Sequence, residues 1–512
     1  MKFGTDERGK IRTIEEVARI VERLKRKGKV IVHCHGVYDL MHPGHIRHLE
    51  AARRQGDVLV VTITPDRYVN KGPGRPVFNG HLRAESIAAL SCVDYAAINC
   101  WPTAVEAINL LKPGVYVKGS DYAAPEQDIT GGIVHEREAV EQCGGRVHFT
   151  DELSFSSTEL LNNFFSVFPA PTKAFLAEFK SVHSADSVIN SMRSLASMKI
   201  LVIGDTIIDE YHYCKGLGKA TKENFICTKF ISEERFAGGV LACANHSAGF
   251  VKEVNMVTCL GTQDDKRDYV LAHLKPNIEP TLFARPDACT VIKRRFVDPA
   301  FLNKLFEVQF FNDYPLPPEL SVEVRDFLEG AVPAYDMVLV SDFGHGFIDE
   351  KIIEVLCRKA RFLAVNTQTN SANTGYNLIT KYPRADYVCI DEPEMRYAAR
   401  DKYGDIRIAI EKIARELHCG KVAVTRGHLG AVTYERADGF FEIPVFSDKI
   451  VDRVGAGDAF LSVTAPMAAG GIPMDVIGLV GNLAGALNVS VVCNRSSVEP
   501  APLHKSVIAM LK

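Results

Sequence analysis

Two histidines three residues apart stand just before and at the start of a helix predicted at roughly residues 46–54, near the beginning of the chain. His42 and His45 flank a Pro-Gly turn and follow an apolar, strand-like run at residues 30–32. Backbone N–H groups and the dipole at a helix start favour anions, and this spacing lets both imidazoles point at one phosphate. A lone histidine pair is more often structural. Here, however, the whole run has the parts that phosphate chemistry requires: Gly36, Tyr38, Asp39, His42, Gly44 and His45.

A second stretch with this potential lies towards the other end of the chain, at residues 451–460. Three small residues, Gly455, Ala456 and Gly457, let backbone N–H groups approach a phosphate closely, and Asp458 follows at the start of an apolar helix. A carboxylate there can take a proton from a hydroxyl while the N–H groups stabilise the moving phosphoryl group. We therefore expect phosphoryl transfer with Asp458 as the base.

Alternating strands and helices must position both stretches. Thr13 and Glu16 have the spacing of a capping box, helical periodicity follows to residue 24, and buried strands are predicted at 57–64 and 199–204. This alternation predicts an α/β fold with parallel sheets, right-handed crossovers and ligands at the carboxyl ends of the strands.

A proline-containing break at residues 169–171 separates two halves of the 512-residue chain, which is too long for one typical core. Residues 173–197 have mixed helical periodicity that fits either a linker helix or an outer helix of the second half. We predict a first domain at 1–165, a connecting segment at 166–197 and a second domain at 198–512.

Composition excludes several classes of partner. A formal net charge of −3 gives no electrostatic case for nucleic acid or for a membrane surface. The 13 cysteines include no CxxC pair and no zinc-like spacing with histidine, which favours free thiols in a reducing compartment. The sequence has no stretch of about 18 apolar residues and no apolar segment at its start, so we expect a cytoplasmic protein.

The first run resembles the GxFDxxHxGH signature of the small nucleotidyltransferases, with Tyr38 in place of the usual Phe. The resemblance implies a Rossmann-like domain that transfers a nucleotidyl group from a nucleoside triphosphate to an alcohol phosphate with the help of Mg²⁺. His42, His45 and Lys71, the last in a basic Gly- and Pro-rich loop, would be its catalytic residues. The implied nucleotide contacts are Gly36, Tyr38, Asp39, Arg83, Lys118, Ser156, Ser157 and Thr158.

The second run resembles the DTxGAGDxF signature of ribokinase-like sugar kinases, and further marks of that family follow in order. The resemblance implies a ribokinase-like α/β domain with a small β lid, in which Asp458 is catalytic. Its implied nucleotide contacts are Thr425, Gly427, Gly430, Gly455, Ala456, Gly457 and Asn482. Its implied sugar-site residues are Asp205, Asp209, Gly238, Gly239 and Asp342, and its metal-associated pair is Asp391 and Glu394.

Two basic residues in the predicted lid strand add to the substrate-binding set. Lys293 and Arg295 alternate onto one face, which would either meet an anionic sugar or be solvated. The chain also departs from the heptose kinases within this family. It has Ala242 where they have an asparagine, His345 where they have a lysine, and Val454 where a threonine is expected.

Together the halves resemble the bifunctional heptose-7-phosphate kinase/heptose-1-phosphate adenylyltransferases, with the domain order reversed. The resemblance implies an enzyme of sugar-nucleotide (ADP-heptose-like) biosynthesis. The second domain would phosphorylate a sugar phosphate with ATP, and the first would adenylylate a sugar 1-phosphate and release pyrophosphate. It also implies a homodimer, because such lids often form dimer contacts. Two alternatives stay open: a CTP-dependent cytidylyltransferase acting on a polyol phosphate supplied by the kinase, and a transferase with a non-catalytic kinase-like module for binding or dimerisation.

Overall fold

The computed structural model describes residues 9–69, 75–119, 132–150, 168–446 and 450–511. The chain divides into two compact units, one of Met1–Pro169 with His504–Lys512 and one of Ala170–Leu503, and each is described by itself. Four predicted site residues lie outside the described residues: Lys71, Ser156, Ser157 and Thr158.

The first unit is built on a parallel sheet that, within the described residues, has five strands in the order β3-β2-β1-β4-β5. The order reverses between β1 and β4, and in open α/β sheets ligands bind at the carboxyl ends of strands beside such a switch point. The strands are β1 (Ile31–Gly36), β2 (Val58–Ile63), β3 (Tyr95–Ile98), β4 (Val115–Gly119) and β5 (Arg146–Thr150).

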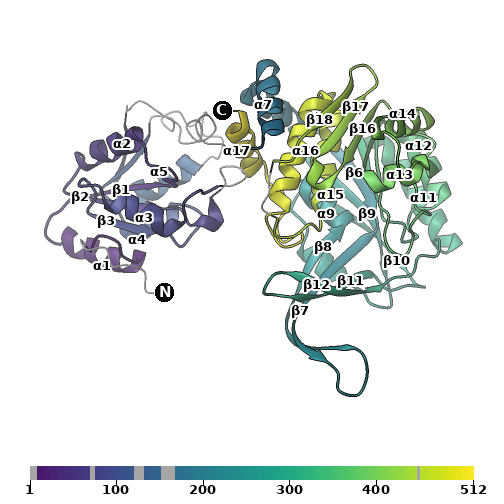
Figure 1. Ribbon diagram of the computed structural model, residues 1–512, viewed down its shortest axis with the longest axis horizontal. Helices are drawn as coiled ribbons and strands as arrows, with labels where there is room; N and C mark the ends of the chain where they lie inside the picture. Colours follow the sequence, from purple (N-terminus) through teal and green to yellow (C-terminus); the bar gives the residue numbers. More distant parts are fainter. Residues whose placement is uncertain (1–8, 70–74, 120–131, 151–167, 447–449, 512) are drawn as a thin grey trace. The chain divides into compact units, whose positions relative to one another are not determined.

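Helices cover both faces of this sheet (Figure 1). The capping box predicted from Thr13 and Glu16 is confirmed, since each side chain bonds the other residue's backbone N–H. The helix predicted at 46–54 begins earlier, at Pro43, because His42 caps it. The helical segments are α1 (Ile14–Lys25), α2 (Pro43–Arg53), η1 (Asp66–Tyr68), α3 (Gly80–Ala88), α4 (Val105–Leu111) and α5 (Gly132–Gln142).

The second unit is built on a larger sheet with nine strands among the described residues. The strands are parallel from β10 to β16, and β17 pairs antiparallel with both β16 and β18. A buried apolar cluster on this sheet includes Leu201, Val340 and Leu356. In sheet order the strands are β10 (Ile278–Arg285), β9 (Glu253–Gly261), β6 (Lys199–Gly204), β13 (Met337–Asp342), β14 (Leu363–Thr367), β15 (Tyr387–Asp391), β16 (Lys421–Thr425), β17 (Ala431–Glu435) and β18 (Gly439–Ile443).

A second, four-stranded sheet, the lid, confirms the small β lid that the resemblance implied. Only the first part of β7, from Ile207 to Tyr213, pairs with β11, so the rest of β7 and its partner β8 form a two-stranded hairpin that projects from the unit (Figure 1). In sheet order the strands are β12 (Asn303–Phe310), β11 (Val291–Asp298), β7 (Thr206–Lys219) and β8 (Ile226–Gly239).

Helices on the outside of the main sheet include two from the segment whose role the sequence left open. Both α7 and α8 belong to the second unit: Phe175 packs on Phe446, and His183 bonds Asp475 at 2.7 Å. The helices are α7 (Ala170–Val182), α8 (Ala185–Arg193), α9 (Val240–Ser247), α10 (Arg267–Ala272), α11 (Pro318–Ala331), α12 (Glu350–Lys359), α13 (Glu392–Ala399), α14 (Ile406–Glu416), α15 (Ala456–Ala469) and α16 (Met474–Asn488). The last helix, α17 (Pro500–Leu511), begins in the second unit and belongs to the first unit from His504 on.

Two of the sequence expectations can be compared with the described residues directly. Each of the 13 cysteines has a free thiol. Among helices formed by the described residues, none combines the length and apolar character that a bilayer crossing demands.

Candidate active sites

The two motif histidines of the first unit stack on each other at the start of α2. Their ring centroids lie 3.8 Å apart, with an angle of 28° between the ring planes. His42 is the N-cap residue, and its Nδ1 accepts a hydrogen bond from the N–H of Gly44 at 3.1 Å. The local sequence therefore holds both imidazoles beside the helix N-terminus, where an anion is favoured.

The residues just before this pair shape the turn that presents it. Tyr38 has a φ of 50°, in the left-handed region, and its ring meets the His45 ring edge-on at 5.3 Å. A Cβ at Gly36 would lie 3.0 Å from the Tyr38 ring, so this position requires a glycine or a shifted tyrosine. The carboxylate of Asp39 accepts the N–H of Phe78 at 3.0 Å and lies 3.5 Å from Arg75, so Asp39 anchors the segment that follows the basic loop.

Arg83 lies deeper than a nucleotide-contacting residue would. Its side chain is buried and donates to the carbonyls of Phe78 at 2.9 Å, Val37 at 2.5 Å and Thr64 at 2.8 Å, and it pairs with Asp66. Four of its five N–H donors are thereby engaged within the protein. The expectation of a direct nucleotide contact needs correction: Arg83 ties together the segments that follow β1 and β2.

Lys118, at the carboxyl end of β4, lies near polar and ionisable side chains that the sequence analysis did not select. Its ammonium lies 2.9 Å from Glu136, and His48 bonds Thr150 at 2.8 Å. Burial and then the Lys118 charge lower the pKa of His35 and bring the pKa of His48 to about 4. Both imidazoles are therefore neutral, and Lys118 is the cation at the edge where β1 and β4 end.

In the second unit, α15 begins within the run of small residues. Gly455 has a φ of 87°, and a Cβ there would lie 2.0 Å from the side-chain oxygen of Asn494, so only glycine fits. Asp458 lies in the first turn of α15 and is buried. Burial, followed by the negative charge of Asp209, raises the pKa of Asp458 to about 7. A carboxyl group with this pKa is suited to take a proton near neutral pH.

The Gly-Gly pair makes room for the carboxylate of Asp209. A Cβ at Gly238 would lie 2.3 Å from Asp209 Oδ2, and a Cβ at Gly239, where φ is 55°, would lie 2.4 Å from the carbonyl oxygen of Asp205. The structure therefore brings Asp209 and Gly238 of the lid strands together on the side of Asp458.

Lys293 and Arg295 do alternate onto one face of β11, in register with Asp209 and Tyr211 of β7. The alternative of a solvated face is wrong, because Lys293 is only 7% exposed. Arg295 forms ion pairs with Asp209 and, at 2.7 Å, with Glu307, so its charge is neutralised within the lid. Of the two cations, Lys293 is the one without a carboxylate in ion-pair contact among the described residues.

Asp205 and Asp342 anchor the segment between β13 and α12. Asp205 accepts the N–H groups of Phe343 at 2.9 Å and His345 at 3.4 Å, while Asp342 accepts Tyr382 OH at 2.7 Å. Burial and then the charge of Asp342 raise the pKa of Asp205 to about 6. Both carboxylates hold the protein chain, and their direct contact with a substrate stays a prediction.

The predicted metal pair forms a capping box at the start of α13. Asp391 accepts the N–H of Glu394 at 2.8 Å, and Glu394 accepts the N–H groups of Asp391 and Thr369 at 2.9 and 2.7 Å. Burial raises the pKa of Glu394 to about 8. Among the described residues no three carboxylate, histidine or cysteine groups could hold a metal. In the structure the pair caps α13, and its predicted association with a metal stays a prediction.

The predicted nucleotide contacts of the second unit gather around the turn after β16. Gly427 and Gly430 have φ angles of 56° and 87°, and a Cβ at Gly430 would lie 2.0 Å from the carbonyl oxygen of Ile443. Asn482 donates to the carbonyl groups of Ile443 and Pro444, and Thr425 is the last residue of β16. These residues lie near the end of β16, and the Asn482 amide nitrogen is hydrogen-bonded to backbone carbonyl groups.

A buried cluster just before α15 was not foreseen. Asp452 accepts Tyr211 OH and the ammonium of Lys304, each at 2.6 Å, and the N–H groups of Val454 and Cys493. Despite its burial, these donors lower the pKa of Asp452. Nothing local in the sequence links these residues, because they come from β7, β12 and two later loops.

Comparisons with known proteins agree with this division. Residues 33–163 match the model of cytidylyltransferase-like domains, and residues 316–500 match that of pfkB family carbohydrate kinases. The chain thus carries a nucleotidyltransferase-like unit followed by a unit with the carbohydrate kinase fold.

Curated relatives match over the first of these regions. The "Bifunctional protein HldE" of Gluconobacter oxydans is 41% identical over 157 residues, which are 30% of this chain and 31% of the relative. That of Syntrophotalea carbinolica is 40% identical over 151 residues, 29% of each chain. The chain thus spans about three tenths of the length of these relatives in the matched regions. Among solved structures, a ribokinase from Thermotoga maritima is 19% identical with a TM-score of 0.48, over 60% of this chain and 99% of its own.

Proposed function

We propose that the protein is a bifunctional enzyme that makes a nucleotide-activated sugar. The second unit phosphorylates a heptose-7-phosphate-like sugar phosphate with ATP, and the first unit transfers an adenylyl group to a sugar 1-phosphate with release of pyrophosphate. The observation that carries the proposal is the presence, in one chain, of a stacked histidine pair at one helix start and a buried aspartate at another. The relatives' shared name, which calls them bifunctional, supports it.

In the first unit the chemistry needs no covalent intermediate. An oxygen of the acceptor phosphate attacks the α-phosphorus, the bond to the bridging oxygen breaks, and pyrophosphate leaves. His42, His45 and Lys118 provide imidazoles and one ammonium around the spreading negative charge, and the N–H groups at the start of α2 add their dipoles. Mg²⁺, arriving with the triphosphate, supplies further charge neutralisation.

In the second unit Asp458 takes the proton of a sugar hydroxyl as its oxygen attacks the γ-phosphorus, and ADP leaves. The N–H groups at the start of α15 face the transferred phosphoryl group, and Gly455 permits that approach. Asp209, which forms an ion pair with Arg295, orients the sugar at the lid. This intact arrangement favours a catalytic kinase over a non-catalytic module.

A pair of substitutions tests the two activities separately. His42→Ala should abolish pyrophosphate release and spare ADP release from a sugar phosphate, and Asp458→Asn should do the reverse. If either substitution removed both activities in a folded protein, independent sites would be refuted. Absence of ADP release with every sugar phosphate would support the non-catalytic module instead.

The base of the nucleotide is tested by supplying labelled ATP and CTP in parallel. The description of the matched domain model as cytidylyltransferase-like is the reason to keep CTP, with a polyol phosphate acceptor, as the second candidate. Transfer of label from ATP alone supports the adenylyltransferase, and transfer from CTP alone replaces it with the alternative.

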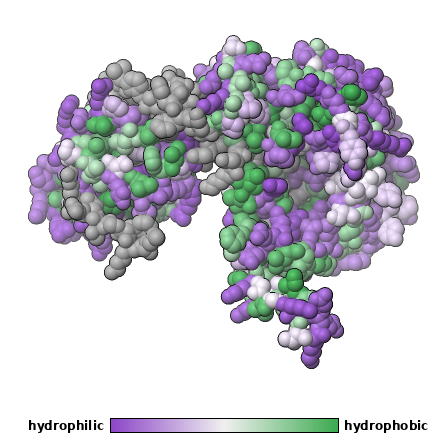
Figure 2. Space-filling model, viewed as in Figure 1, coloured by the Kyte–Doolittle hydropathy of each residue, from purple (hydrophilic) through white to green (hydrophobic). Residues whose placement is uncertain are grey.

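We also propose a homodimer that forms through the lid, in the cytoplasm, where both triphosphates are supplied. Apolar side chains of β12 stand on the lid face opposite Lys293 and are exposed: Phe306 (52%), Val308 (39%) and Phe310 (38%). Figure 2 shows apolar residues on this part of the unit beside hydrophilic ones. Exposed apolar patches of this kind mark association surfaces. Phe306→Glu should convert a dimer to a monomer in sedimentation experiments, and an unchanged mass would reject the surface.

A further inference from the structure

The imidazole of His345 is buried, yet neither of its ring nitrogens has a hydrogen-bond partner within the described residues. A polar group buried in this way costs about 1–3 kcal/mol unless something pairs with it. The residue takes the place of a lysine in the resembling heptose kinases, and His345 has no role in the mechanism above. The ring is therefore a buried polar group of the second unit that a ligand could pair with.

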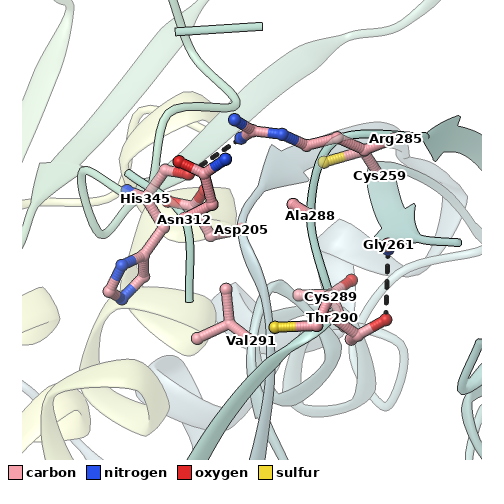
Figure 3. Close-up of a pocket in the computed structure, with 11 residues that line it drawn as sticks. Asp205, Cys259, Gly261, Arg285, Ala288, Cys289, Thr290, Val291, Asn312 and His345 are labelled. Atoms are coloured by element: carbon pink, nitrogen blue, oxygen red, sulfur yellow. Dashed lines mark hydrogen bonds between the residues drawn. The ribbon is translucent and has the colours of Figure 1, made fainter. Parts of the chain in front are cut away.

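His345 lines a small cavity of about 20 Å³ whose other polar groups are satisfied. Arg285 bonds Asp287 and the carbonyl groups of His345 and Tyr314, and Asp205 accepts the N–H groups of residues 343 and 345. Figure 3 shows the imidazole pointing away from Arg285, on the side of Val291. A cavity of this size admits one water-sized group, such as a single oxygen of a larger ligand.

The strand β11 carries a basic residue, Lys293, near His345. Lys293 follows Val291 by two residues on β11 and so shares its face of the lid. Its ammonium lies 5.2 Å from the ring centroid of Phe343, two residues before His345. The Lys293 charge, after burial, helps lower the pKa of His345 to about 3, so the imidazole is neutral and one of its nitrogens donates. Arg295 cannot compete for an anion, since two carboxylates hold it.

We propose that Lys293 and His345 together bind the phosphate group that the sugar substrate of the kinase unit already carries, and that this pair sets the preference for phosphorylated sugars. The inference rests on the proposed kinase function and adds the residues that select its substrate class. The phosphate oxygens accept from the ammonium and from one imidazole N–H, which supplies the partner that the buried ring lacks. No covalent step is involved.

Equilibrium binding tests the pair without relying on turnover. The probes are a heptose 7-phosphate, the same heptose without phosphate, and inorganic phosphate, each titrated calorimetrically into the full-length protein. We expect the phosphorylated sugar to bind at least tenfold more tightly than the free sugar. His345→Phe and Lys293→Met should each remove most of that difference, and His345→Gln, which keeps one N–H donor, should retain part of it. His273→Phe, at the residue that follows α10, is the matched control and should change nothing.

Kinetics separate binding from catalysis. At pH 8.5, where Asp458 is ionised, the KM for the phosphorylated sugar should rise about tenfold in His345→Phe and Lys293→Met, while the KM for ATP and the kcat stay within about threefold. Thermal melting and ATP binding establish that each variant is folded. If His345→Phe does not fold, Lys293→Met and His345→Gln provide the test.

The outcomes distinguish the inference from the function on which it rests. The inference is overturned if the folded variants still bind the phosphorylated sugar more tightly than the free sugar by the wild-type factor. It is also overturned if the wild-type protein binds the phosphorylated and free sugars equally well. Both conclusions hold even if the kinase unit phosphorylates a sugar. Phosphate-dependent binding that the variants lose, in a protein that phosphorylates no sugar, supports the inference and refutes the kinase function.

Discussion

The raised pKa of Asp458 predicts a pH dependence for the proposed kinase activity of the second unit. Asp458 must be ionised to accept a proton, and its pKa is raised to about 7 by burial and by the charge of Asp209. About one molecule in eleven is then ionised at pH 6 and about ten in eleven at pH 8, because one pH unit changes the ratio tenfold. The kcat for ADP release should therefore rise about tenfold between these values, whereas an ordinary aspartate would give a flat profile.

The assay measures ADP release at saturating ATP and sugar phosphate from pH 5.5 to 8.5. Pyrophosphate release by the first unit, in the same samples, is the internal control, because Asp458 takes no part in it. Lys293 lowers the pKa of Asp458, so Lys293→Met should move the acidic limb to higher pH. Asp458→Asn should reduce kcat by about 100- to 10,000-fold, the usual contribution of a general base.

Two results would refute this reasoning. One is a kcat that does not change between pH 6 and pH 8 in the wild type. The other is an acidic limb at the same pH in Lys293→Met, which would show that the limb belongs to a different group.

Three further substitutions test other parts of the structure. Gly238→Ala places a Cβ 2.3 Å from the Asp209 carboxylate. The kcat/KM for the sugar should therefore fall at least about tenfold, with little change in Tm. An unaltered kcat/KM would contradict this placement of Asp209. Arg83→Ala leaves three buried carbonyl groups without their donor and should destabilise the first unit by about 3–5 kcal/mol in urea unfolding, while ADP release by the second unit persists; a wild-type unfolding midpoint would argue against its anchoring role. The lowered pKa of Asp452 means that its stabilisation is present above the ordinary pKa of aspartate and is lost as pH falls through the lower pKa of the folded state. Lys304→Met should therefore reduce Tm at pH 7 more than at pH 2, and equal losses at both pH values would count against the ion pair.

Local patterns predicted much of the fold. The apolar runs at 57–64 and 199–204 are strands, and the Thr13 and Glu16 spacing is a capping box. Each of these depends on residues close together in the sequence, where periodicity and capping chemistry act. The start of α2 was placed three residues late, because the capping role of His42 was not recognised.

Contacts between distant segments explain what the sequence could not predict. The alternation of Lys293 and Arg295 was visible, but the neutralisation of Arg295 depends on Glu307, which reaches it only through the pairing of β11 with β12. Arg83 was expected at the nucleotide, yet the carbonyl groups it binds come from three separate segments. The capping role of Asp391 and Glu394 did have a local signal, an acidic residue three positions after an aspartate, and the metal interpretation overlooked it.

A single residue connects the central sheet of the second unit to its lid. β6 ends at Gly204, β7 begins at Thr206, and only Asp205 stands between the central sheet and the lid. Four residues farther on, Asp209 lies at the root of a strand whose outer end reaches solvent. Because Asp209 and the hairpin belong to the same strand, a displacement of the hairpin would move the backbone of the carboxylate that the proposed function places at the sugar.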